Sequence, residues 1–143
     1  MFILYFLISC SVCLSDITKR RIYNVQIVAM LVLCLTITEQ SITQILVSIL
    51  LILSIALILF STNIWGGGDG KLLTALSPLF PVSQVPDLLF SVLLCGGVVS
   101  SVYLLKKLLV EKKRSSFGIP YGVAIVCGAN LSLYFSKGLP IYS

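Results

Sequence analysis

The chain has 143 residues, of which 58% are hydrophobic and 10% are charged, and its mean hydropathy is +1.10. This apolar excess excludes an ordinary soluble domain of the same length and indicates a protein that lies in a lipid bilayer. The net charge of +5 comes from short Lys and Arg clusters between apolar runs, without interleaved aromatic residues, which argues against nucleic acid as a partner.

Six apolar runs follow one another along the chain. They cover residues 1–15, 22–38, 42–61, 71–81, 87–105 and 117–136. In hydrocarbon only helices satisfy the backbone across such runs, so the sequence predicts an all-α, polytopic integral membrane protein with about six transmembrane helices in a single domain, 1–143. The first run has no basic residue ahead of it and is expected to remain as a helix rather than be removed as a signal peptide. The fourth is short and contains Pro78, which predicts a half-length or tilted segment.

The basic residues predict the orientation of these helices. All Lys and Arg residues except Lys137 follow the first, third or fifth predicted helix. Positively charged loops face the cytoplasm, which places the N-terminus outside in a multi-pass protein of the inner (cytoplasmic) membrane. Contact of the basic loop 106–114 with lipid headgroups or substrate is a further possibility, but a plain topology signal explains it more simply.

Three of the five acidic residues have simple structural interpretations. Glu39 is expected in an outer loop, Asp87 in the first turn of a helix, where its charge meets the helix dipole, and Glu111 among cytoplasmic lysines. Asp16 and Asp69 remain. Each of these two needs its own interpretation.

Asp16 follows an apolar run of about 15 residues. At roughly 1.5 Å per residue this run reaches about 22 Å, which is less than a hydrocarbon core of about 30 Å. Asp16 should therefore lie within or near the membrane. The alternative is a carboxylate that marks the helix end and pairs with Lys19 or Arg20.

Asp69 lies in a glycine-rich stretch, residues 65–71 (WGGGDGK), between the third and fourth predicted helices. Glycine permits close backbone approaches, so such a loop can bring an aspartate against a neighbouring helix. The alternative is a flexible connector. A phosphate-binding loop is excluded because Trp65 and Leu72 stand where its pattern needs Gly and Ser or Thr.

The predicted topology brings both aspartates to the cytoplasmic side, where they can meet. Two close carboxylates share a proton, so that one acts as a base on water and the other donates to a carbonyl oxygen. This aspartyl protease chemistry needs no metal, cofactor or histidine, and the chain contains no histidine.

The segments around these residues resemble the prepilin peptidases, the GxGD aspartyl proteases of peptidase family A24 that process type IV pilin and Flp or Tad pilin precursors. That family pairs an aspartate and an Ile-Pro-Asn type segment after helix 1 with GxGD followed by Lys-Leu, and has a Pro-Tyr-Gly entry to its last helix. The corresponding segments here are residues 16–24 (DITKRRIYN), 66–73 (GGGDGKLL) and 119–125 (IPYGVAI). Tyr23 departs from the family by replacing its usual proline, which leaves the start of the second helix less constrained.

The resemblance implies an aspartic endopeptidase with Asp16 and Asp69 as its catalytic residues. It also implies residues that bind substrate or shape the site: Gly66, Gly68, Lys71, Asn24, Pro120 and Gly122. The substrate would be a prepilin or pseudopilin precursor, cut after a glycine on the cytoplasmic side to remove a short basic leader. Nothing corresponds to the cytoplasmic domain with paired CxxC motifs of larger members, so N-methylation is not expected, and Cys10 and Cys13 are interpreted as small apolar side chains. The oligomeric state stays open.

Two other classes remain as alternatives. The first is a non-enzymatic small transporter or channel subunit that passes protons or cations along the same carboxylates, although such proteins often show internal repeats and none is found. The second is the presenilin and signal-peptide peptidase group, which shares GxGD but pairs it with a Tyr-Asp motif, whereas Asp16 follows Ser15. Archaeal preflagellin peptidases stay closer to this sequence, and the catalytic residues alone do not distinguish them from the bacterial prepilin peptidases.

Overall fold

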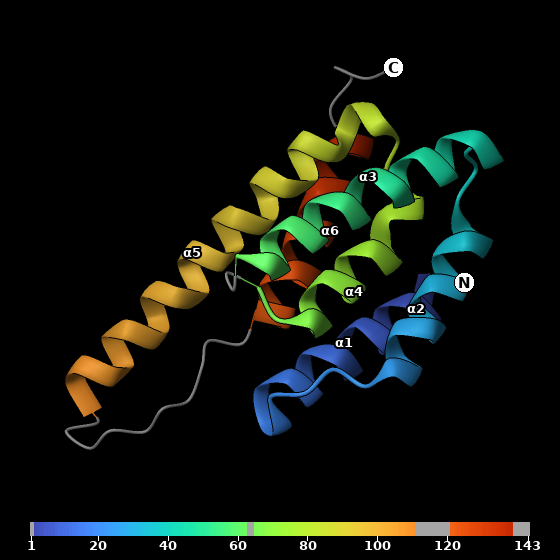
Figure 1. The fold of residues 1–143 in the computed structure, drawn as a ribbon. Helices are drawn as coiled ribbons and strands as arrows, with labels where there is room; N and C mark the ends of the chain where they lie inside the picture. The colour runs from blue at the N-terminus through green and yellow to red at the C-terminus, as the bar shows by residue number, and fades with distance from the viewer. Residues whose placement is uncertain (1, 63–64, 111–120, 139–143) are drawn as a thin grey trace.

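The computed structural model describes residues 2–62, 65–110 and 121–138, which fold into a bundle of helices (Figure 1). The α-helices are α1 (Phe2–Lys19), α2 (Asn24–Ile37), α3 (Ile42–Ser61), α4 (Gly67–Leu76), α5 (Val85–Val110) and α6 (Tyr121–Gly138). Two short 3-10 helices, η1 (Ser77–Leu79) and η2 (Val82–Gln84), connect α4 to α5. The predicted all-α class and the order of the helices are confirmed for these residues.

Two helix boundaries differ from the predicted ones in a way that affects the site. Helix α1 continues to Lys19, so Asp16 lies within the helix rather than after it. Helix α4 begins at Gly67, so Asp69 lies in its first turn and not in a loop or flexible connector. The helix ends at Leu76, ahead of the 3-10 turn that contains Pro78, because proline cannot continue the backbone hydrogen bonds of a helix.

Two of the described helical segments, Ile42–Ser61 and Val82–Lys106, are long and apolar enough to cross a membrane. Asn24–Ile37 and Tyr121–Ser136 are apolar but shorter. Helix α4 has 10 residues and spans about 15 Å, half of a hydrocarbon core of about 30 Å. The half-length fourth segment is therefore confirmed, whereas six membrane spans and an outside N-terminus stay predictions.

Large apolar side chains cover the outer surface of the bundle. On α3, for example, Leu46, Leu50 and Leu57 are 54%, 62% and 58% exposed. Soluble monomers rarely expose a contiguous apolar surface of this kind, whereas a bilayer covers it with acyl chains.

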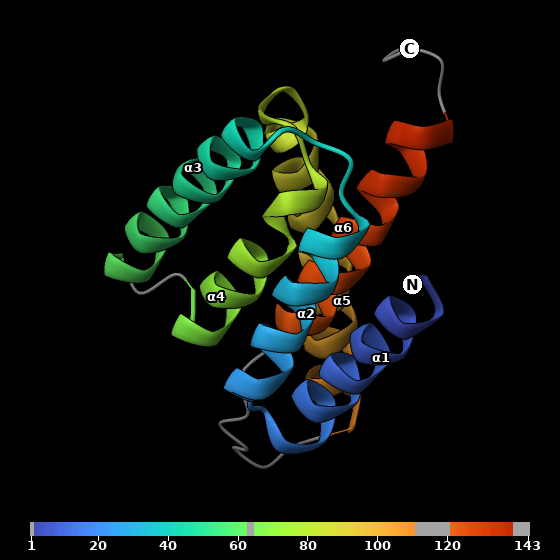
Figure 2. The ribbon, with the colours of Figure 1, turned by 90° about the vertical axis from the view of Figure 1, so that its right-hand side faces the viewer.

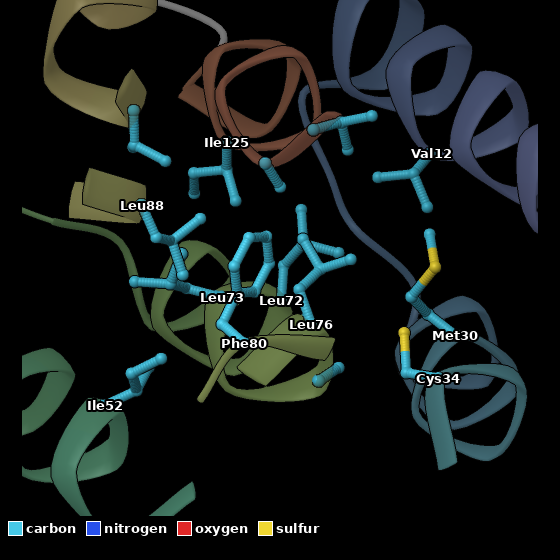
Figure 3. Packing of buried hydrophobic residues seen from close by; sticks show 14 of the residues in the cluster. Val12, Met30, Cys34, Ile52, Leu72, Leu73, Leu76, Phe80, Leu88 and Ile125 are labelled. Carbon is cyan, nitrogen blue, oxygen red and sulfur yellow. The ribbon is translucent and has the colours of Figure 1, made fainter. Parts of the chain in front are cut away.

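The short helix α4 forms the centre of the bundle. Figure 2 shows it between α3 and α2, and it also contacts α6. Its Leu72, Leu73 and Leu76 are fully buried, and Figure 3 shows them within a cluster of side chains from the other helices. These neighbours are Val12 of α1, Met30 and Cys34 of α2, Ile52 of α3, Leu88 of α5 and Ile125 of α6. A helix surrounded by protein in this way holds Asp69, at its N-terminal end, in a fixed place.

Helices α5 and α6 run side by side (Figure 1), and their backbones lie close together at Gly128. A Cβ at this position would lie 2.6 Å from the Cα atom and 2.7 Å from the backbone N atom of Val92. Small residues permit such close contacts between membrane helices.

Gly128→Ala is expected to lower the free energy of unfolding by about 1–3 kcal/mol, because a backbone contact cannot yield as a side chain can. The melting temperature of the purified protein in detergent measures this loss. Gly97→Ala on α5 is the matched control, since a Cβ there meets nothing within 4 Å. Equal melting temperatures for the two variants would contradict the close packing of α5 on α6.

Candidate active site

Asp16 lies on α1 with its side chain pointed at the start of α6. It is buried, with 6% of its surface exposed, and its Oδ2 accepts a hydrogen bond of 3.2 Å from the backbone N–H of Val123. Val123 belongs to the first turn of α6, where N–H groups have no partner within the helix and the helix dipole favours negative charge. The last described helix therefore provides a fixed donor for a carboxylate on the first.

Gly122 makes this approach possible. A Cβ at this position would lie 2.8 Å from Oδ2 and 3.0 Å from Cγ of Asp16. Real side chains essentially never come this close, so only glycine leaves room for the Asp16 carboxylate at the start of α6.

Asp69 occupies the third position of α4, and its own carboxylate caps that helix. Its Oδ2 accepts a hydrogen bond of 3.3 Å from the backbone N–H of Gly66, the N-cap residue. The described glycines all have negative φ, so the glycine-rich stretch serves close packing rather than unusual backbone conformations. At Gly70, for example, an added Cβ would lie 3.1 Å from the Cβ of Ala56 on α3. Asp69 thus lies in the first turn of its own helix, α4, whereas Asp16 lies near the end of α1 and against the first turn of α6.

Ile22 connects these two helix starts. It lies in the connection between α1 and α2, where a Cβ added at Gly122 would meet its Cδ1 at 3.1 Å, and a Cβ added at Gly68 would meet its own Cβ at 3.7 Å. One side chain therefore packs against the α6 end that holds Asp16 and against the α4 turn that carries Asp69. The turn that carries Asp69 and the helix end that holds Asp16 are therefore neighbours.

The electrostatics of Asp69 agree with this proximity. Burial of the side chain and the negative charge of Asp16 raise the pKa of Asp69 from 3.8 to about 6, and the hydrogen bond from Gly66 opposes part of this rise. The proton is therefore held more tightly in the folded protein than in the unfolded chain. One carboxyl of the pair keeps its proton to a higher pH than an ordinary aspartic acid.

This raised pKa predicts a pH-dependent stability. A carboxyl whose folded pKa exceeds its unfolded value destabilises the fold as pH rises from about 4 to about 6, and the whole penalty remains above that range. Asp69→Asn removes the penalty, so we expect its free energy of unfolding at pH 7.5 to be about 1–2 kcal/mol higher than that of wild type, after allowance for partial solvent screening. The melting temperatures of Asp69→Asn and wild type, measured in detergent, should become equal near pH 4. A difference that does not change with pH would contradict the assignment.

Two of the remaining predicted residues are exposed. Asn24 is exposed at the first position of α2, and Lys71 is exposed on α4. Pro120 lies outside the described residues. Lys19 and Arg20, the cations considered as partners of Asp16, lie over aromatic rings: Lys19 Nζ is 5.6 Å from the ring centre of Tyr23, and Arg20 Cζ is 4.8 Å from that of Tyr103.

Three contributors to the site were not predicted: Ile22, the backbone amide of Val123, and the side chain of Gln26. Gln26 forms hydrogen bonds with Ser11 and Ser15, which lie one helical turn apart on α1. Only Gln26 had a sequence signal, because a Gln at the third position of a helix often caps it. Among the described residues no group of three His, Cys, Asp or Glu side chains could hold a metal ion.

Two aspartates on separate helices of an apolar bundle thus lie near neighbouring helix starts, Asp69 in the first turn of α4 and Asp16 against the first turn of α6. The class of protein that these features define is an apolar helical membrane protein with two neighbouring acidic side chains. The profile of the type IV leader peptidase family, peptidase A24, matches residues 1–101, which include both aspartates. The match covers more than half of the chain, so the chain belongs to the type IV leader peptidase family.

Family membership makes the chain a membrane peptidase and does not favour the transporter or channel alternative. The segment around Pro120 and Gly122 lies beyond the matched residues. Comparisons with curated proteins and with solved structures gave no significant match.

Proposed function

We propose that the chain is a membrane aspartyl endopeptidase that removes the short basic leader from type IV or Flp-type prepilins or pseudopilins. The observation that carries the proposal is the pair formed by Asp16 and Asp69, joined through Ile22 and coupled by charge. Paired carboxylates with one shared proton are the working group of aspartic proteases. Both lie in the part of the chain that the peptidase family covers.

The two aspartates take different roles in this mechanism. Asp69 carries the proton in the active form, because its raised pKa of about 6 leaves a larger protonated fraction near neutral pH than an ordinary aspartic acid has, and Asp16 acts as the base, which its N–H donor from Val123 supports. Asp16 removes a proton from water while the water oxygen attacks the scissile carbonyl carbon, and Asp69 gives its proton to the carbonyl oxygen. The tetrahedral intermediate then collapses: one of its hydroxyl groups returns a proton to Asp69 as the C=O bond reforms, the C–N bond breaks, and the amine leaves with the proton that Asp16 took up.

The glycines and polar residues near the pair shape the site in this proposal. Gly122 and Gly68 leave room for Asp16 and Ile22, and Gly66 donates its N–H to Asp69. Lys71 and Asn24, both exposed, are available to the substrate backbone. Pro120 is proposed to set the entry to α6, as in the family motif.

Topology decides which part of a precursor reaches the site. With six spans and an outside N-terminus in the inner membrane, both aspartates face the cytoplasm, where the basic leader of a prepilin would be held. The apolar segment that follows the leader would lie in the lipid beside the bundle. The substrate is therefore a precursor with a cytoplasmic basic leader, a glycine at the cleavage point and an apolar helix after it.

Reconstitution tests the proposal directly. The purified chain in proteoliposomes is expected to cut a candidate prepilin after the leader glycine, as shown by sequencing the new N-terminus, and to do so equally well with a metal chelator. Asp87→Asn, at the start of α5, is the control for loss of an acidic residue outside the pair. A chain that inserts but cuts no prepilin, or that needs a metal ion for turnover, would contradict the proposal.

A further inference from the structure

The side chain of Gln26 joins α1 to the start of α2. Its Nε2 donates to Ser11 Oγ at 2.9 Å, and its Oε1 accepts from Ser15 Oγ at 3.0 Å and from the backbone N–H of Tyr23 at 3.2 Å. Ser11 and Ser15 lie one helical turn apart on the same face of α1. One amide group therefore contacts two helices and the connection between them.

The orientation of this amide follows from its partners. A backbone N–H only donates, so the Gln26 atom that faces Tyr23 must be the carbonyl oxygen. The other atom is then the NH2 group, which donates to Ser11. The hydroxyl of Ser15 also lies 3.0 Å from the Val12 carbonyl oxygen and shares its single hydrogen between two acceptors. The bonds to Ser11 and Tyr23 are therefore the ones in which the donor hydrogen is not shared with a second acceptor.

These partners flank the segment that carries Asp16. Ser11 and Ser15 precede Asp16, and Tyr23 follows it, so the amide closes the segment at both ends. The segment includes Arg20, whose φ of 53° lies in the left-handed region that a non-glycine residue adopts only when its surroundings hold it there. Ile22, next to Tyr23, packs where Gly122 and Gly68 leave room.

We propose that Gln26 is a positioning residue for Asp16: by bonding to both flanks of the segment 15–23, its amide fixes the Asp16 carboxylate relative to the N-terminus of α6. This role rests on the proposed peptidase function for its effect on catalysis, but the geometric effect does not depend on that function. Gln26 bonds to Ser11, Ser15 and Tyr23, so it acts on Asp16 through the backbone that carries this residue.

The backbone of Tyr23 offers a specific test. Its φ of −79° lies within the range that proline adopts, and the residue precedes the first turn of α2, where proline is tolerated. Tyr23→Pro would fix this φ covalently and would remove the N–H that Gln26 now satisfies. A proline here should therefore replace the part of the constraint that Gln26 provides through Tyr23.

The experiment compares wild type, Gln26→Ala, Tyr23→Pro and the double variant, with Gln44→Ala as the matched control on the exposed first turn of α3. With a prepilin substrate, Gln26→Ala is expected to lower kcat by about 10- to 100-fold while KM changes little, because a small displacement of a catalytic group impairs chemistry more than binding. The double variant should recover part of this loss. Tyr23→Pro alone and Gln44→Ala should behave as wild type.

A second readout follows the Asp16 carboxylate without any substrate. The amide signal of Val123 in 15N-valine-labelled protein, assigned by its absence in Val123→Ile, reports the hydrogen bond to Asp16. We expect Gln26→Ala to shift this signal and the double variant to move it back toward the wild-type position. If the wild type cuts no prepilin, the proposed function fails while this signal still tests the role of Gln26. A Val123 signal that Gln26→Ala leaves unchanged, or a shift that Tyr23→Pro does not reverse, overturns the inference.

Discussion

Asp16→Asn and Asp69→Asn are each expected to lower the rate of prepilin cleavage by roughly 10³- to 10⁴-fold or more, because each removes one proton-transfer group of the pair. Asparagine preserves the shape of each side chain. Its carbonyl oxygen can still accept the N–H of Val123 at position 16 or the N–H of Gly66 at position 69. Both variants should therefore fold and insert, and the loss should appear in kcat.

The control separates chemistry from folding. Asp87→Asn, at the start of α5, should retain wild-type turnover, and all three variants should insert into proteoliposomes to the same extent. Measurable cleavage by either Asp16→Asn or Asp69→Asn at more than a few per cent of the wild-type rate would rule out a mechanism that needs both carboxylates.

Gly122→Ala has the second largest expected effect. Its Cβ would lie 2.8 Å from Asp16 Oδ2 and 3.1 Å from Ile22 Cδ1, and both atoms are at the ends of side chains that can move. The protein should therefore stay folded, but the carboxylate must shift away from the N–H of Val123. A misplacement of about 1 Å costs roughly 100-fold in rate, so kcat/KM is expected to fall by at least about that factor.

Gly67→Ala provides the comparison within the glycine-rich stretch. Its added Cβ would meet Phe60 at 3.6 Å, an ordinary contact, so this variant should keep most of its activity. Equal activity of Gly122→Ala and wild type would mean that the close approach of Asp16 to α6 has no part in catalysis. Melting temperatures measured on the same preparations would identify a loss that comes from unfolding instead.

Much of the fold could be predicted because apolar runs in this chain correspond to helices one by one. The expected place of Asp87 at a helix start is also confirmed. The predicted start of the fourth helix was wrong, because glycine is a poor helix former and its abundance at residues 66–70 argues for a loop. Tertiary packing overrides this preference, since Gly70 lies against Ala56 where a larger residue would not fit.

The site was only partly predictable. Asp16 and Asp69 stand out because the chain has only five acidic residues and the other three have simple structural interpretations, and this signal needs no knowledge of packing. Their surroundings do not stand out: Ile22 is one apolar residue among many, and the N–H of Val123 belongs to the backbone, which every residue has. Which helix supplies a donor to Asp16 depends on how helices pack, and the hydrophobic pattern does not encode this arrangement.

The hydrogen bond between Asp16 and Val123 joins residues that are 107 positions apart. A ribosome adding about 5–20 residues per second makes Asp16 roughly 5–20 s before Val123. During that interval the growing chain contains Asp16 and later Asp69, but it does not yet contain the N–H of Val123 that orients Asp16. The hydrogen bond that orients Asp16 can therefore form only after translation has passed both aspartates and reached α6, so the surroundings of Asp16 are completed late in synthesis.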